Sequence, residues 1–197
     1  MKTQNIPELK AFSRIALLAV LLMLVSCKTK EDSTQKDSDT TVSQSEAPQV
    51  DLHTAVLTEN MEAVKQQIAA GSNLNEKDPF GGSSPLITAS LFGKTEMAKT
   101  LIEAGADINF QNNDGSTALH TAAFFCRPEI VKMLLDKSAD KTIRNKFGAT
   151  AYESVAAPYS DVKNTYEVME KVLGPMGLKI DYSYIEKTRP VVAEMLK

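Results

Sequence analysis

The sequence predicts an all-α solenoid of about four helix-turn-helix units, with a capping helix at its C-terminal end. Two short phrases recur along the chain with the same spacing. The first phrase begins at Ser84, Thr117 and Thr150, in equal steps of about 33 residues. The second begins at Gly71, Gly105 and Ser138, in nearly the same steps. Two independent markers with one period indicate stacked units, none of which buries its apolar face alone.

Each phrase predicts one helix end or turn. Thr117 is placed to cap a first helix, because its hydroxyl can accept a backbone N–H that has no partner inside the helix. Pro85 follows a Ser84 cap, where a missing N–H has no cost. Gly105 suits the left-handed residue that ends a second helix, and Asn113–Gly115 is typical of a turn tip. The expected order in each unit is helix, tight turn, helix and projecting loop.

The units are expected at residues 50–78, 79–111, 112–144 and 145–180, with the cap at 181–197. The outer helix of unit four, Glu167–Leu173, matches that of unit three only at an offset of 38, so a short insertion is expected near Pro158. Pro190 leaves two alternatives open for the cap. Either a helix that begins near Ser183 is kinked at Pro190, or a shorter helix is capped by Thr188.

The segment Asp114–Ala123 (DGSTALHTAA), followed by Glu129–Leu135 (EIVKMLL), resembles the ankyrin repeat. The resemblance covers about residues 50–174 and implies an ankyrin-repeat solenoid that binds proteins. In this family, partners meet the loop tips and the exposed side of the first helix in each unit. Carried onto matching positions, the partner-binding residues are expected to be Phe80, Ser83, Phe92, Asn113, Ser116, Phe125, Lys146 and Phe147. The alternative is that Phe92 and Phe125 shield the second helix and belong to the core.

The N-terminal segment predicts export and a lipid anchor. Basic residues precede the apolar run Ile15–Val25, which is shorter than the roughly 20 residues that span a bilayer. The run fits a secretory signal peptide. It ends in Leu24–Cys27 (LVSC), which resembles a bacterial lipobox, so the signal peptide is expected at 1–26 and lipid attachment at Cys27. The alternative is a short buried helix with a chance cysteine.

The segment after Cys27 predicts a tether. Residues 28–48 contain one Val, one Ala and no larger apolar side chain, so a disordered polar linker is expected from 27 to 48. Its r.m.s. span would be roughly 25 Å, and several acyl chains would anchor it stably. Lys28, by resemblance to the sorting rule of Gram-negative lipoproteins, favours the outer membrane. The short Lys30–Asp32 run resembles tags that send some lipoproteins to the cell surface.

Composition and titratable residues give no sign of catalysis. Without the signal peptide the chain has 19 basic and 24 acidic side chains, a net charge of −5, so nucleic acid is not an expected partner. His53 and His120 both occupy the Leu-His position that ties adjacent turns in ankyrin repeats. Cys126 stands where these repeats carry glycine, as a structural filler or, alternatively, as a redox or partner-linking thiol. We expect a monomer with no metal, no cofactor and no enzymatic activity.

Two functions stay open at this level. The first is a lipid-anchored, non-enzymatic interaction module in the bacterial cell envelope. The second is an accessory or protective subunit of an envelope enzyme or toxin, with no catalysis of its own. An enzyme would show a pocket with convergent titratable groups, and two histidines in 197 residues argue against one.

Overall fold

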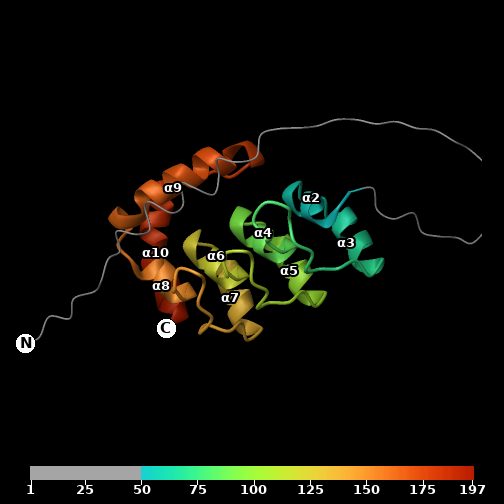
Figure 1. Cartoon of the computed structure of the whole chain (residues 1–197), viewed down its shortest axis with the longest axis horizontal. Coiled ribbons are helices and arrows are strands. Elements are labelled where there is room, and N and C mark those ends of the chain that lie inside the picture. Colours follow the sequence, from blue (N-terminus) through green and yellow to red (C-terminus); the bar gives the residue numbers. More distant parts are fainter. Residues whose placement is uncertain (1–49) are drawn as a thin grey trace, which may run out of the picture. The chain divides into compact units, whose positions relative to one another are not determined.

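A computed structural model describes residues 50–197, so the signal peptide, Cys27 and the 27–48 linker lie outside the described residues. This part of the chain is helical and contains no strand, as the sequence predicts. The helices follow one another along an elongated stack (Figure 1). They are α2 (Leu52–Leu57), α3 (Met61–Ala69), α4 (Pro85–Phe92), α5 (Thr95–Glu103), α6 (Ala118–Phe124), α7 (Pro128–Asp136), α8 (Ala151–Ala156), α9 (Tyr159–Leu173), the 3₁₀ turn η2 (Gly174–Met176) and α10 (Tyr182–Leu196).

The first helix of each unit starts at a capping side chain. The hydroxyls of Ser84 and Thr117 accept the backbone N–H three residues further on, which confirms the two predicted caps. Thr150 caps α8 in the same way. In unit one Asp51 takes the same role for α2. Glu153 also reaches back to the Thr150 N–H, completing a capping box. The repeated phrase therefore fixes where each inner helix begins, because the cap satisfies an otherwise unpaired donor.

The turns between helices repeat their backbone conformation as well. Gly105 and Gly115 have positive φ angles of +90° and +72°, as predicted for a helix end and a turn tip. Cys126 has φ +52°, in the place where unit two has Gly93 at φ +67°. A side chain at Gly93 would also lie 2.8 Å from Arg127 Nε. This position of the turn thus keeps a left-handed backbone conformation even where the residue is not glycine.

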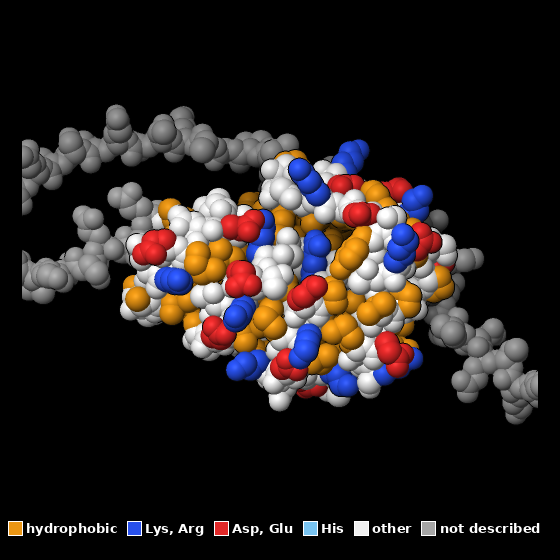
Figure 2. Space-filling view, turned by 180° about the vertical axis from the view of Figure 1, so that it is seen from behind, with side chains coloured by type: hydrophobic (Ala, Val, Ile, Leu, Met, Phe, Trp, Pro, Cys, Tyr) orange, Lys and Arg blue, Asp and Glu red, His pale blue; other side chains and the backbone are white. Residues whose placement is uncertain are grey.

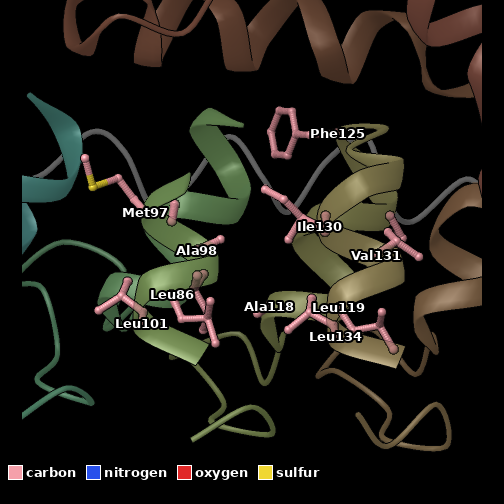
Figure 3. Close-up of a cluster of buried hydrophobic side chains, with 14 of the residues drawn as sticks. Leu86, Met97, Ala98, Leu101, Ala118, Leu119, Phe125, Ile130, Val131 and Leu134 are labelled. Carbon is pink, nitrogen blue, oxygen red and sulfur yellow. The ribbon is translucent and has the colours of Figure 1, made fainter. Parts of the chain in front are cut away.

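The core runs through the stack between inner and outer helices (Figure 3). The inner helices α4 and α6 are buried along almost their whole length, with alanine at Ala89, Ala122 and Ala123 where helices approach closely. The outer helices α5 and α7 bury one face each. The largest side chains of this core include Leu86, Leu101, Leu119, Ile130 and Leu134. Continuous apolar packing between neighbouring units holds the stack together.

Unit four differs from the expected arrangement. Its inner helix α8 packs against α10, as α4 packs against α5 and α6 against α7, and α10 also packs against α7. The outer helix of unit four is therefore α10. The assignment of Glu167–Leu173 to that place is wrong, because those residues belong to α9, which lies outside the stack of pairs. Residues 159–161 begin α9 and form no inserted loop.

The sequence contains a signal for this register. Arg127–Leu134 reads RPEIVKML, and Arg189–Leu196 reads RPVVAEML. The buried residues Ile130, Val131 and Leu134 correspond to Val192, Ala193 and Leu196 in this alignment. The step that leads from Thr117 to Thr150 would lead from Arg127 only to position 160, so the segment 160–188 is an insertion. It holds nearly all of α9, η2 and the first half of α10.

The observed bounds of the C-terminal helix decide between its two alternatives. The helix α10 begins at Tyr182, after the Asp181 cap, and continues through Pro190. The alternative with one longer helix is therefore confirmed, with its start one residue before Ser183. Pro190 corresponds to Pro128, the first residue of α7. The insertion thus extends the N-terminal part of the last helix by about two turns.

Candidate protein-binding face

Three projecting turns, one each in units two, three and four, form an ordered edge of the stack. Each turn starts at a residue whose side chain accepts backbone N–H groups within the turn. The Asp78 carboxylate accepts from Phe80, Gly81 and Ser83 at 2.7–2.8 Å. Asn112 and Asn145 repeat this arrangement with two N–H donors each. The backbone of every turn is therefore held from within.

The turns are also joined to one another. Asn113 donates its N–H to the carbonyl of Gly81 at 2.9 Å, and Lys146 donates to the carbonyl of Asp114 at 2.8 Å. A hydrogen bond at 3.4 Å links the Asn145 side chain to the Ser116 hydroxyl. Further back, the Asn75 and Asn109 side chains accept the N–H groups of Asp107 and Asp140 in the next unit. We call the edge formed by residues 78–83, 112–116 and 145–149 the tip row.

The tip row displays aromatic side chains at its two ends. Phe80 is 88% exposed, and Phe147 is 47% exposed. Asn113 and Lys146 are the polar predicted residues of the row, and Ser83 and Ser116 are half-buried within it. Six of the eight predicted partner-binding residues thus lie in one hydrogen-bonded row. Whether a partner contacts them is still a prediction.

The other two predicted residues lie elsewhere. Phe92 is half-buried at the far end of α4, about 12 Å along an eight-residue helix from its start. Phe125 is only 3% exposed. Its ring packs edge-on against Phe124 at 5.2 Å and against Tyr166 at 6.3 Å. The alternative that Phe125 belongs to the core is therefore confirmed, and its expected place among the exposed partner-binding residues is wrong, because Tyr166 from α9 packs against its ring.

The sequence reasoning missed two arginines, largely withdrawn from solvent, that occupy one repeated position. Arg127 donates to the carbonyl of Leu91 at 3.4 Å, at the C-terminal end of α4. Arg189, 2% exposed, donates to the Tyr166 hydroxyl at 2.7 Å and to the Ala157 carbonyl at 2.9 Å. The Tyr166 hydroxyl in turn donates to the carbonyl of Phe124, the counterpart of Leu91. Helix C-termini are partially negative, so they stabilise these cations.

The charged groups near the tip row are bound into the turns. Burial acts to raise the pKa of Asp78, but the N–H donors of its own turn outweigh it and lower that pKa. Hydrogen bonding from Thr150 and Arg144 lowers the pKa of Glu153. Arg144 also donates to the Gly148 carbonyl. On the face drawn in Figure 2, basic, acidic and hydrophobic side chains are interspersed.

Both histidines have structural roles, as expected. His53 Nε2 lies 2.9 Å from the Glu76 carbonyl, and its Nδ1 lies 3.4 Å from the Thr88 hydroxyl of the next unit. His120 Nδ1 accepts the Thr117 N–H, so its Nε2 carries the proton and donates to the Ala149 carbonyl at 3.1 Å. Each imidazole ring therefore links the first helix of its unit to a projecting segment that comes later in the chain.

Acidification is expected to lower stability through His120. Burial lowers the pKa of this imidazole, although carbonyls of Ala149 and Ile143 act to raise it. Because the folded state disfavours the proton, its stability is complete above the unfolded pKa of about 6.5 and falls as pH drops below it. Urea titrations between pH 7.5 and 5 should show this loss, and His120→Asn should remove it. If stability still falls by the same amount in His120→Asn, His120 is not the cause of the loss.

The one free thiol among residues 50–197 lies in the core. Cys126 is buried, and burial raises the pKa of its thiol to about 11. It stays protonated at neutral pH, which fits the structural-filler interpretation. No group of three or more His, Cys, Asp or Glu side chains in this part of the chain is arranged to hold a metal ion. Its helices also lack the combination of length and apolar character that a membrane span requires.

Comparison with known proteins identifies the repeats. Residues 52–145 match the family model for ankyrin repeats in three copies, so this segment consists of ankyrin repeats and the chain has the ankyrin-repeat fold. Over 64 residues the chain is 39% identical to protein phosphatase 1 regulatory subunit 27 of Homo sapiens and to that of Mus musculus. The match covers 32% of this chain and 41% of each relative, so it spans about two fifths of their length.

A solved structure agrees with the fold. The ankyrin repeat domain of Bcl-3, described as a unique member of the IkappaB protein family, superposes with a TM-score of 0.51 at 33% sequence identity. The superposition covers 52% of this chain and 45% of that one. Ankyrin repeats imply protein–protein interaction, and the matched relatives are named as regulatory subunits.

Proposed function

We propose that this protein is a non-enzymatic interaction module that binds a protein partner across its tip row and is tethered by lipid to the bacterial cell envelope. The observation that carries the interaction proposal is Phe80. Its side chain is 88% exposed on a turn whose backbone is held by three hydrogen bonds to one carboxylate. An exposed aromatic on a rigid turn offers a large apolar contact with little ordering cost on binding.

The spacing of the tip row sets a geometric demand on the partner. Phe80 and Phe147 belong to turns two units apart, and with about 8–10 Å per helix layer they are separated by roughly 16–20 Å. Polar groups of Asn113 and Asp114 lie between them. The partner should therefore carry two apolar sites at this separation with hydrogen-bonding groups in the middle.

Photo-crosslinking from the tip row tests the interaction. The photoreactive residue p-benzoylphenylalanine replaces Phe80 in one strain and the exposed Glu103 of the outer helix α5 in another. We expect irradiation of cells to give a discrete adduct with one protein from position 80 and none from position 103. Adducts from position 103 alone would move the binding surface to the outer helices and contradict the proposal.

The anchoring proposal is supported by the sequence before the repeats. The apolar run Ile15–Val25, which leads into the LVSC segment, and the polar segment 28–48 are together typical of a lipoprotein with a tether. In this proposal Cys27 carries the lipid, and Lys28 directs the protein to the outer membrane. The repeat stack is then held near the membrane by the tether alone.

Metabolic labelling with a palmitate analogue tests the anchor. We expect the label to be lost in Cys27→Ser and kept in Cys126→Ser, because the thiol of Cys126 is buried in the repeats. Fractionation of the same strains should move the Cys27→Ser protein out of the membrane fraction. Label that persists in Cys27→Ser would remove the lipoprotein proposal.

A second candidate is favoured by the name of the matched relatives, which are regulatory subunits of an enzyme. In this version the partner captured at the tip row is itself an envelope enzyme or toxin, and the repeat protein protects or regulates it. Two measurements separate this candidate from a purely structural contact. The first is the identity of the crosslinked protein, and the second is its activity with and without the bound repeats.

A further inference from the structure

The helix α10 lacks the charge pattern that the other outer helices carry on their solvent side. The second residue of α3, of α5 and of α7 is a glutamate, and three residues further on each helix has a lysine. All six side chains are exposed, and they are Glu62 and Lys65, Glu96 and Lys99, and Glu129 and Lys132. Since Pro190 corresponds to Pro128, α10 has Val191 and Glu194 at these two positions. One outer helix of the four thus has a valine where the others place a charge.

Val191 belongs to an exposed apolar surface. It is 56% exposed, and Tyr184, seven residues earlier on the same side of the helix, is 42% exposed. A shallow hollow beside Val191 is lined by Pro190, Val191, Glu194 and Met195. Apolar side chains that are contiguous on a surface are typical of an interaction site. We call the surface formed by Tyr184, Lys187, Pro190, Val191, Glu194 and Met195 the outer face of α10.

The charges of the outer face are placed so that the face complements itself. Lys187 and Glu194 are exposed and lie two helical turns apart, about 10 Å, on one side of α10. The midpoint between them falls at Pro190 and Val191. If two copies of α10 lie antiparallel with a two-fold axis at this midpoint, Lys187 of each copy lies opposite Glu194 of the other. Within one chain Glu194 pairs with Lys197 at 2.6 Å, but both side chains are largely exposed, so exchanging this partner costs little.

The apolar residues of the outer face fit the same antiparallel arrangement. Val191 lies next to the axis, so the valines of the two copies meet and each enters the hollow of the other copy. Tyr184 and Met195 lie at opposite ends of the face, on the same side of the helix. Antiparallel pairing therefore brings Tyr184 of one copy close to Met195 of the other, and the contact of an aromatic ring with a thioether sulfur is favourable.

We propose that the outer face of α10 is a homodimer contact, in which two copies of this chain pair antiparallel about a two-fold axis at Pro190 and Val191. The valines form the apolar centre, and two ion pairs between Lys187 and Glu194 fix the register. A contact between two single helices is smaller than the roughly 1,200–2,000 Å² that stable complexes bury, so the dimer dissociates on dilution. The dimer differs from the monomer expected from the sequence, and its contact shares no residue with the tip row.

Trapping the dimer through one cysteine tests the proposal. Val191→Cys places a thiol beside the two-fold axis, and Glu129→Cys places one at the equivalent position of α7. We expect mild oxidation of cells that produce the full chain to give a disulfide-linked homodimer of Val191→Cys. The wild-type chain, which controls for Cys27 and Cys126, and Glu129→Cys should give little or none. If Val191→Cys links no more than Glu129→Cys does, or links to a different protein instead, the proposal is overturned.

Charge reversal in the Val191→Cys chain tests the antiparallel register. Lys187→Glu and Glu194→Lys each turn both ion pairs of the dimer into repulsions. Each reversal should therefore lower the initial rate of disulfide linking by about 2- to 30-fold, as expected for two exposed ion pairs. The two reversals together restore opposite charges and should return the rate to that of Val191→Cys alone. A combined variant that links as slowly as the single reversals would contradict the antiparallel contact.

Val191→Glu gives α10 the residue that the other outer helices carry at this position. We expect photo-crosslinking from p-benzoylphenylalanine in place of Tyr184 to give a homodimer adduct, and Val191→Glu to remove it. The melting temperature should not change, because Val191 is exposed and its substitution leaves the core intact. An adduct that persists in Val191→Glu would show that the two copies meet elsewhere. A lowered melting temperature would make Val191 a structural residue of the single chain, and either result would overturn the proposal.

Discussion

Replacing both Phe80 and Phe147 with alanine is expected to weaken partner binding by about 2–4 kcal/mol, the range of aromatic hot spots. The melting temperature should change little, because the turns are held by Asp78 and Asn145 and by backbone hydrogen bonds that do not involve either ring. Phe80, 88% exposed, is the cleaner single variant. Affinity for the crosslinked partner is measured by calorimetry on protein whose folded fraction is known.

The control for this prediction is a pair of exposed residues on the outer helices, Glu103→Ala and Lys132→Ala. These should leave both affinity and stability unchanged, since surface substitutions away from special features have small effects. If the phenylalanine variants unfold while affinity per folded molecule stays constant, both rings are structural. The binding surface must then lie on the outer helices or the insertion.

Leu134→Ala is expected to lower the free energy of unfolding by about 2–5 kcal/mol, and Leu135→Ala by less. Leu134 is fully buried in the outer helix α7, where it faces the core. Leu135 is only half-buried, one residue further around the helix. A truncation that opens a cavity costs more than one at a partly solvated site, because the lost contacts are not replaced by water.

Urea unfolding of the two variants at neutral pH, with helical signal as the readout, decides this comparison. Equal losses, or a greater loss for Leu135→Ala, would contradict the orientation of α7. The same measurement on Leu196→Ala examines the unit-four register. Leu196 corresponds to Leu134 and is buried, so it should also behave as a core residue.

The parts of this fold that were predictable from sequence are governed by local interactions. A cap at Thr117, a left-handed residue at Gly105 and a turn at Asn113–Gly115 each depend on neighbours within a few residues. Their chemistry can therefore be read from short phrases. The exposure of Phe80 follows the same logic, because a residue at the tip of a projecting turn has few possible neighbours.

The errors arose where residues distant in sequence decide the outcome. Phe125 occupies a surface position of its own unit, but Tyr166 from the insertion buries it. The sequence pattern predicts the outer helix of unit four at Glu167–Leu173 because α9 is amphipathic. It also follows α7 at close to one repeat length. The better match at Arg189–Leu196 lies beyond the period, on the far side of the insertion. Aligning the RPxxxxML segments, instead of extending the period, would have identified α10.

Mapping the surface that the partner protects tests directly whether the tip row is the binding face. Backbone hydrogen exchange of the protein, alone and saturated with the crosslinked partner, reports every segment at once. We expect slower exchange in residues 78–83, 112–116 and 145–149, with exchange in α5 and α7 unchanged. Slower exchange confined to the outer helices α5 and α7, with the three turns unaffected, would contradict it.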